Sequence, residues 1–189
     1  MAVMEAIATQ YTEATVTSVE FTLPTSGYAH LQFRIAGQVD NGGFHEYFYM
    51  WLGASGSADT GANQYANGAL RGYGTSETGY QGGWGSPRLY SPYIIGYGND
   101  PLNLKYNNIG GKSGITIDVF DYANTNKQTS MIYTIAQPNY TGGISNIVLG
   151  GWSWKDTSTP NYARFATDTV ASTGFTRGCS FSLYGIKSS

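Results

Sequence analysis

Two aspartates three residues apart, Asp118 and Asp121, have a spacing that raises the question of an acid–base site. The residues around them alternate between β-branched and polar types, which predicts a strand, and residues three apart on a strand face opposite sides. Carboxylates on opposite sides cannot converge on one glycosidic bond, so we interpret both as solvated residues at a strand end. Glu20 and Glu46 are the other acids on predicted strands, and a depolymerase is the least favoured function.

Nucleotide, metal and thiol chemistry are also poorly supported. The Gly-Lys-Ser sequence ending at Ser113 lacks the first glycine of a phosphate-binding loop, because Tyr106 stands at that position. A calcium site at Asn99 and Asp100 lacks the dense oxygen-ligand spacing of a calcium loop. Two histidines and a single cysteine, Cys179, give neither a zinc ligand set nor a disulfide framework. We therefore expect no catalytic residue, no metal and no cofactor.

The residues that stand out are the aromatic side chains of a glycine-rich stretch at about 63–100. Two interpretations stay open. In one, the rings form a platform on which sugar rings stack, with nearby amides binding the hydroxyl groups. In the other, which we favour, the rings and two arginines anchor contacts between subunits. The candidate ligand or interface residues are Tyr65, Arg71, Tyr73, Tyr80, Trp84, Arg88, Tyr90, Tyr93 and Tyr97.

Short strands must position these residues, because helix signals are nearly absent. Turn-forming residues interrupt the chain about every eight to twelve residues, which is typical of an all-β sandwich. Apolar and polar residues alternate in several segments, as expected for a sheet with one buried face and one solvent-exposed face. We predict an all-β fold, an antiparallel two-sheet sandwich that is jelly-roll-like. Its strands are expected at 15–23, 28–35, 44–52, 64–71, 89–95, 114–122, 129–135, 145–152, 163–169 and 178–186.

The chain divides into a short arm and one domain. Residues 1–13 have too few apolar positions to stabilise an isolated helix. We expect them to form an N-terminal arm that anchors the protein or contacts a neighbouring subunit. Residues 14–189 are expected to form a single β-sandwich domain with long Gly/Tyr-rich loops at about 63–100, a length at which loops are commonly functional.

Composition argues against several classes of partner. Ten basic and twelve acidic residues give a net charge of −2, with no basic stripe, so we expect no nucleic acid. The longest apolar run, at 47–52, is far shorter than the roughly 20 residues of a membrane span, so we expect no membrane insertion. No Lys or Arg precedes Arg34, so we expect no secretory signal and folding in a cytoplasm.

Several short segments, taken in order, resemble a group of small virion proteins of tailed bacteriophages. They are EAIATQ at 5–10, SVEFT at 18–22, GYAHL at 27–31, NQYANGALRGYG at 63–74, IDVFDYANTNK at 117–127, and an ending at 175–187 that contains SFSLYGI. The ending is similar to the final L-Y-G motif of that group. Two features depart from its pattern: Cys179 stands where a small residue is usual, and the Gly/Tyr-rich stretch at 73–97 is longer.

The resemblance implies a virion surface role for a jelly-roll-like sandwich that is often a homotrimer. The leading hypothesis is a non-enzymatic structural protein, assembled in the cytoplasm of the bacterial host. It would attach to the shell, and stabilise it, as a capsid decoration or head-fibre protein. Its partners would be the major capsid protein or a fibre-base protein and further copies of itself, with a trimer favoured. The alternative is a receptor-binding or glycan-binding adhesin of a phage fibre, such as a tail fibre, whose partner is a host surface glycan.

Overall fold

A computed structural model of the chain describes residues 3–41, 48–61, 65–73, 76–86, 89–91, 112–140, 144–167 and 172–187. These residues contain strands and connections but no helix. The strands are β1 (Val3–Tyr11), β2 (Ser18–Thr22), β3 (His30–Gly37), β4 (Val39–Asn41), β5 (Phe48–Gly53), β6 (Tyr65–Tyr73), β7 (Ser76–Ser86), β8 (Leu89–Ser91), β9 (Ser113–Phe120), β10 (Thr129–Tyr140), β11 (Ile144–Trp154), β12 (Tyr162–Thr167), β13 (Ser172–Phe175) and β14 (Ser180–Lys187).

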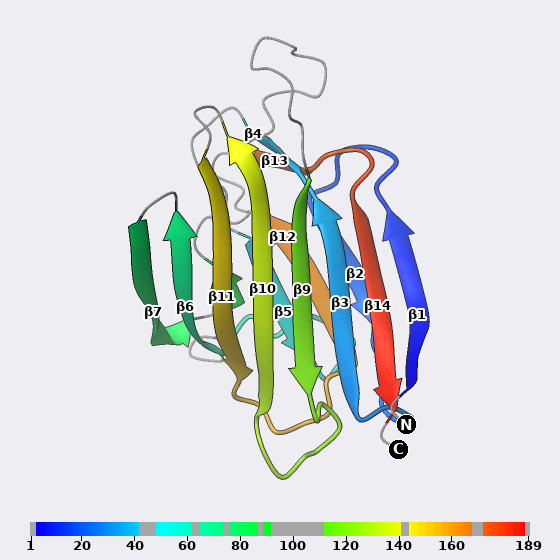
Figure 1. The fold of residues 1–189 in the computed structure, drawn as a ribbon. Coiled ribbons are helices and arrows are strands. Elements are labelled where there is room, and N and C mark those ends of the chain that lie inside the picture. The colour runs from blue at the N-terminus through cyan, green and yellow to red at the C-terminus, as the bar shows by residue number, and fades with distance from the viewer. Residues whose placement is uncertain are drawn as a thin grey trace.

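Two antiparallel sheets pack face to face (Figure 1). The large sheet has eight strands in the order β1-β14-β3-β9-β10-β11-β6-β7, and the small sheet has four in the order β2-β12-β5-β8. A ribbon of β13 and β4 lies at one end of the sandwich. The predicted all-β, antiparallel two-sheet sandwich is confirmed, and each of the ten predicted strands overlaps an observed one.

Alternation along the sequence determines which face of each strand is buried. In β9, Ile115, Ile117 and Val119 are buried while Thr116 and Asp118 between them are partly exposed. The same period of two runs through β3 and β14, which flank one another in the large sheet. A one-residue shift in register would turn every core residue of these strands toward solvent, so the pattern fixes the pairing.

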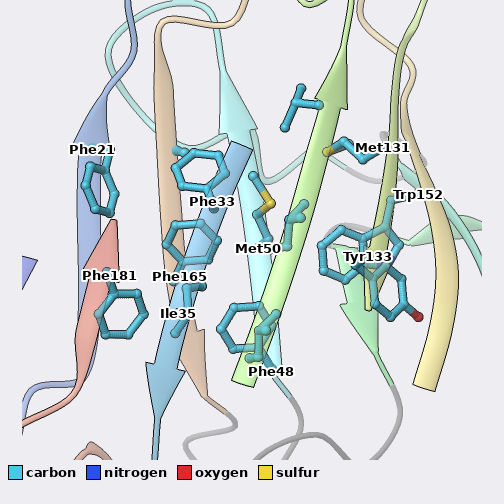
Figure 2. Packing of buried hydrophobic residues seen from close by; sticks show 14 of the residues in the cluster. Phe21, Phe33, Ile35, Phe48, Met50, Met131, Tyr133, Trp152, Phe165 and Phe181 are labelled. Atoms are coloured by element: carbon cyan, nitrogen blue, oxygen red, sulfur yellow. The ribbon is translucent and has the colours of Figure 1, made fainter. Parts of the chain in front are cut away.

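Aromatic rings from both sheets meet in the core, with Phe165 of β12 at their centre (Figure 2). Its ring centroid lies 4.9 Å from that of Phe33 and 5.9 Å from that of Phe181, both in the large sheet. On its own sheet it lies 5.6 Å from Phe48 and 6.2 Å from Phe21. Burial of a side chain of this size stabilises the fold by about 1.5–3 kcal/mol, so these contacts hold the two sheets together.

Residues 3–11 differ from the arm expected for this region. They form edge strand β1, which pairs antiparallel with β14 of the same chain from Val3 opposite Lys187 to Tyr11 opposite Ser180. The burial pattern of β1 shows only partly buried and exposed side chains, as expected for an edge strand. The Lys187 ammonium donates to Glu5 at 2.7 Å, and the Tyr28 hydroxyl donates to the same carboxylate at 3.2 Å. Backbone pairing therefore orders this segment where apolar burial is small.

Candidate functional site

Five of the sequence-based candidates lie in strands β6 and β7, at one edge of the large sheet. Much of the region expected as long loops at 63–100 is strand, because β6 pairs along its length with both β11 and β7. Tyr65 begins β6, with Arg71 and Tyr73 at its other end, while Tyr80 and Trp84 lie in β7 and Tyr90 in β8. Arg88, Tyr93 and Tyr97 lie outside the described residues. Glycine does not prevent strand formation here because both partners of β6 are long.

Tyr65 is a core residue and not a surface contact. Its ring is fully buried, and its hydroxyl donates to the carbonyl oxygens of Leu52 at 3.0 Å and Asp59 at 2.9 Å. It also accepts from the Leu52 N–H at 3.1 Å. Burial, the largest influence, raises the pKa of this phenol well above its ordinary value of 10.0. The Asp59 carboxylate accepts from the indole N–H of Trp154 at 3.1 Å, so the pair joins the connection after β5 to the large sheet.

The outer face of the large sheet carries an apolar strip made of Leu70, Ile132, Ile147 and Leu149. These four side chains are between 47% and 66% exposed, although they lie in regular strands. Leu149 of β11 stands directly opposite Leu70 of β6, and its partner on the other side is Thr134 of β10. Their cross-strand neighbours on this face include Gly151 and Ala136, which place no bulky side chain beside the strip. Such a face can bury apolar surface against a partner with little rearrangement.

The other half of this outer face is a polar ladder that runs across β9, β3, β14 and β1. Gln32 donates to the Asp118 carboxylate at 2.6 Å and accepts from Arg34 Nε at 2.7 Å. A second nitrogen of Arg34 lies 3.3 Å from the Met4 sulfur, and the guanidinium lies over the Tyr184 ring at 4.9 Å. The ladder therefore satisfies its main charged groups internally.

The outer face of the small sheet carries a second cluster, the Arg164 cluster, made of Trp51, Arg164, Glu20 and Tyr162. Arg164 of β12 stands between its direct partners Trp51 of β5 and Glu20 of β2, so all three side chains lie on one face. The guanidinium carbon lies 5.5 Å from the Trp51 ring centroid, and Arg164 Nε lies 3.8 Å from a Glu20 carboxylate oxygen. Tyr162 lies two residues before Arg164 on the same face of β12.

The Arg164 cluster combines a donor atom that has no partner with an accessible carboxylate. The Nε atom of Arg164 is buried and has no hydrogen-bond partner. Burial, followed by the neighbouring Glu20 carboxylate, raises the pKa of Tyr162 to about 12. Trp51 and Tyr162 are both partly exposed, and the Arg164 and Glu20 side chains are 38% and 51% exposed. An aromatic ring, a fork of N–H donors and a carboxylate therefore share one accessible patch.

The acids that the sequence predicts on strands lie in different surroundings where the structure describes them. Glu20 lies on the outer face of the small sheet and Asp118 on the outer face of the large sheet, with the core between them. Asp121 lies in the turn after β9, where Lys127 donates to it at 2.6 Å and its own N–H donates to His30 at 3.0 Å. Within the described ranges, no group of three or more His, Cys, Asp or Glu residues is placed to hold a metal ion. Glu46 lies outside them.

Cys179 lies in the core of the sandwich and not at the surface. The thiol is buried, lies 3.2 Å from both the N–H and the carbonyl oxygen of Gln38, and is a core residue as expected. No helix in the part of the chain that the structure describes is long and apolar enough to cross a membrane.

Sequence reasoning missed both the apolar strip and the Arg164 cluster. Ile132, Ile147 and Leu149 were inside correctly predicted strands, and the alternation of those strands already placed them opposite the core residues. Trp51 belongs to an apolar run whose buried and outward positions alternate less clearly, and Arg164 follows it by more than 100 residues. Only the β5–β12 pairing brings the two together.

Comparisons with known proteins provide little information about the function of these surfaces. No family model and no curated protein matches the chain. Among solved structures, it is similar to the CBM2 module of the evolved Dit of Lactobacillus casei BL23 phage J-1, at 10% identity and a TM-score of 0.29. The match covers 97% of this chain and 77% of that one.

Proposed function

We propose that the protein is a non-enzymatic structural protein of a bacteriophage particle, displayed on the virion surface as a capsid decoration or head-fibre protein. It reaches that surface by assembly in the cytoplasm of the bacterial host. The sequence resemblance supports the phage setting. The observation that carries the attachment role is the apolar strip, since a soluble sandwich gains nothing from four large apolar side chains on an outer face.

Attachment through the strip accounts for its composition. Apolar residues flanked by glycine and alanine bury area at low entropy cost, because the strands that hold them are already rigid. The partner is the major capsid protein or a fibre-base protein, and a homotrimer would multiply weak contacts into stable attachment. The strip lies on β10, β11 and β6, beside the strands that carry most of the aromatic interface candidates.

Particle binding tests this role directly. Particles that lack the protein are mixed with purified wild type or with Leu149→Lys, and bound protein is measured after sedimentation. A charge in the middle of a desolvated contact is costly, so we expect Leu149→Lys to lose at least about tenfold in affinity. The matched control is Thr22→Lys, which adds the same charge at an exposed strand position of the small sheet. Equal binding by both variants would refute attachment through the strip.

The anchor role of residues 1–13 remains a prediction and needs a milder change than truncation. Removal of β1 would expose the edge of β14 and so confuse attachment with folding. A substitution at Tyr11, which is 68% exposed, keeps the β1–β14 pairing. If this segment anchors the protein, Tyr11→Lys should reduce its incorporation into particles. Light scattering of both proteins checks that the substitution has not changed the oligomeric state.

A second function, recognition of a glycan on the host surface, is favoured by a different observation. Trp51 is partly exposed on the outer face of the small sheet, where it lies beside charged hydrogen-bonding groups. Tryptophan combined with a few directed polar groups is a usual composition of sugar sites. Binding of labelled protein to host cells, in competition with purified surface polysaccharide, would separate this adhesin role from particle attachment.

A further inference from the structure

We propose, on the basis of the glycan-binding function above, that the Arg164 cluster binds a neutral saccharide through two neighbouring hydroxyl groups. Arg164 supplies the hydrogen-bond donors, Glu20 supplies the acceptor, and Trp51 supplies an apolar flank for the carbon-bound hydrogens of the sugar. The site occupies the outer face of the small sheet, opposite the apolar strip, so that one face can attach while the other recognises.

A comparison of two arginines within the chain carries this inference. Arg34 and Arg164 both lie over an aromatic ring on an outer face, at 4.9 Å from Tyr184 and 5.5 Å from Trp51. Arg34 donates to Gln32 and contacts the Met4 sulfur, so its guanidinium is engaged within the protein. The Nε atom of Arg164 has no hydrogen-bond partner, and its nearest carboxylate oxygen is 3.8 Å away.

Nε itself is buried and out of reach of a ligand, but the Arg164 side chain as a whole is 38% exposed, so a ligand oxygen would accept from the terminal nitrogens of the guanidinium. The Arg164–Glu20 ion pair is long and exposed, so it holds the two groups together only weakly and leaves both accessible to a ligand. Ligand binding would let the guanidinium and the carboxylate each form hydrogen bonds that the free protein leaves unmade. The guanidinium of Arg164 is therefore available to a ligand, whereas that of Arg34 is engaged within the protein.

The chemistry of the patch selects the class of ligand. Each sugar hydroxyl is both donor and acceptor, so two neighbouring hydroxyls match a guanidinium beside a carboxylate. Tyr162 lies beside Glu20 on the same face, because it is paired with Thr22, and a carboxylate has about four lone-pair sites, so Glu20 keeps acceptor capacity for the ligand. One positive and one negative charge lie side by side, so an anionic ligand would meet Glu20 and a cationic one would meet Arg164. This pairing of opposite charges favours a neutral sugar as the ligand.

The test is a titration of the full chain, labelled with nitrogen-15 at tryptophan, with methyl glycosides of glucose, galactose and mannose. We expect a saturable shift of the Trp51 indole signal with at least one of these sugars. Arg164→Lys keeps the charge but loses the planar fork, and should weaken binding by about tenfold or more. The matched control Arg34→Lys should leave the affinity unchanged, and a glycoside that lacks one of the paired hydroxyls should bind as weakly as Arg164→Lys.

Each alternative outcome has a distinct meaning. If no glycoside shifts any tryptophan signal, both the glycan-binding function and this site fail. If the wild type binds a glycoside and both Arg164→Lys and Trp51→Phe bind it equally well, the glycan function stands and the site is wrong. Binding confined to methyl glucuronide would overturn the neutral class. Circular dichroism of each variant ensures that a lost signal does not reflect a lost fold.

Discussion

The ring of Tyr133 in β10 lies against the backbone of Gly150, its direct partner in β11. A side-chain carbon added at Gly150 would come within 2.2 Å of two atoms of that ring. The ring cannot move aside freely, because the Trp152 ring lies only 4.2 Å away between centroids. The absence of a side chain at this position therefore allows two large aromatic residues to occupy the inner face of the large sheet.

Gly150→Ala should therefore destabilise the fold. Overpacking of a filled core costs about 1–3 kcal/mol, and we expect a loss of this size in the free energy of unfolding by urea. The matched control is Gly151→Ala on the exposed face of the same strand, where the nearest atom to the added carbon is 3.7 Å away. We expect that control to change stability by less than about 0.5 kcal/mol. Equal losses at both positions would contradict the packing described.

Tyr65→Phe should reveal how much the buried hydroxyl contributes. The change removes three hydrogen bonds and leaves the Leu52 N–H and two carbonyl oxygens without this partner. We expect a loss of about 1–3 kcal/mol in the free energy of unfolding. Tyr11→Phe, at an exposed tyrosine, should cost less than about 0.5 kcal/mol. A neutral Tyr65→Phe variant would mean that the hydroxyl is not held as the structure shows.

The Glu5–Lys187 pair should make the β1 edge sensitive to pH. The hydrogen bond from Lys187 is the main cause that lowers the pKa of Glu5 below its ordinary value of 4.5. The same bond raises the pKa of Lys187 above 10.5. A depressed acid pKa stabilises the fold above the unfolded value, and that contribution disappears as pH falls through the folded value. A raised lysine pKa contributes below 10.5 and is lost as pH rises through its folded value.

The variant Glu5→Gln tests this pH dependence of stability. We expect the variant to unfold at a lower temperature than wild type at neutral pH, and the difference to vanish in acid below the folded pKa of Glu5. Both groups are exposed, so the difference will be small, and Glu13→Gln in the loop after β1 provides the control. A difference that persists unchanged in acid would show that the carboxylate charge is not its cause.

Local patterns in the sequence were sufficient for most of the sandwich. The alternation in β3, β9 and β14 placed their buried residues correctly, because these strands have one apolar and one polar face. Two long strands, β1 and β7, were missed for different reasons. β1 buries little apolar surface, while β7 is rich in glycine, and backbone pairing with β14 and β6 orders each of them.

The candidate site was harder to predict because it depends on pairing between distant strands. Tyr65 has the residue type of a contact residue, and its burial becomes visible only when β5 and the connection after it lie against β6. Trp51 and Arg164 acquire their relationship from register, which one sequence does not reveal. The apolar strip was within reach, since outward leucine and isoleucine positions follow from the period of two.

The two ends of the described chain lie together, with Val3 of β1 opposite Lys187 of β14 (Figure 1). Tension applied to these ends would act across the β1–β14 pair and break its hydrogen bonds one after another, as a zipper opens. A load that enters through the apolar strip would instead be shared by β10, β11 and β6, each of which is paired on both sides. The same sandwich is therefore mechanically weak when pulled by its ends and strong when held by its face.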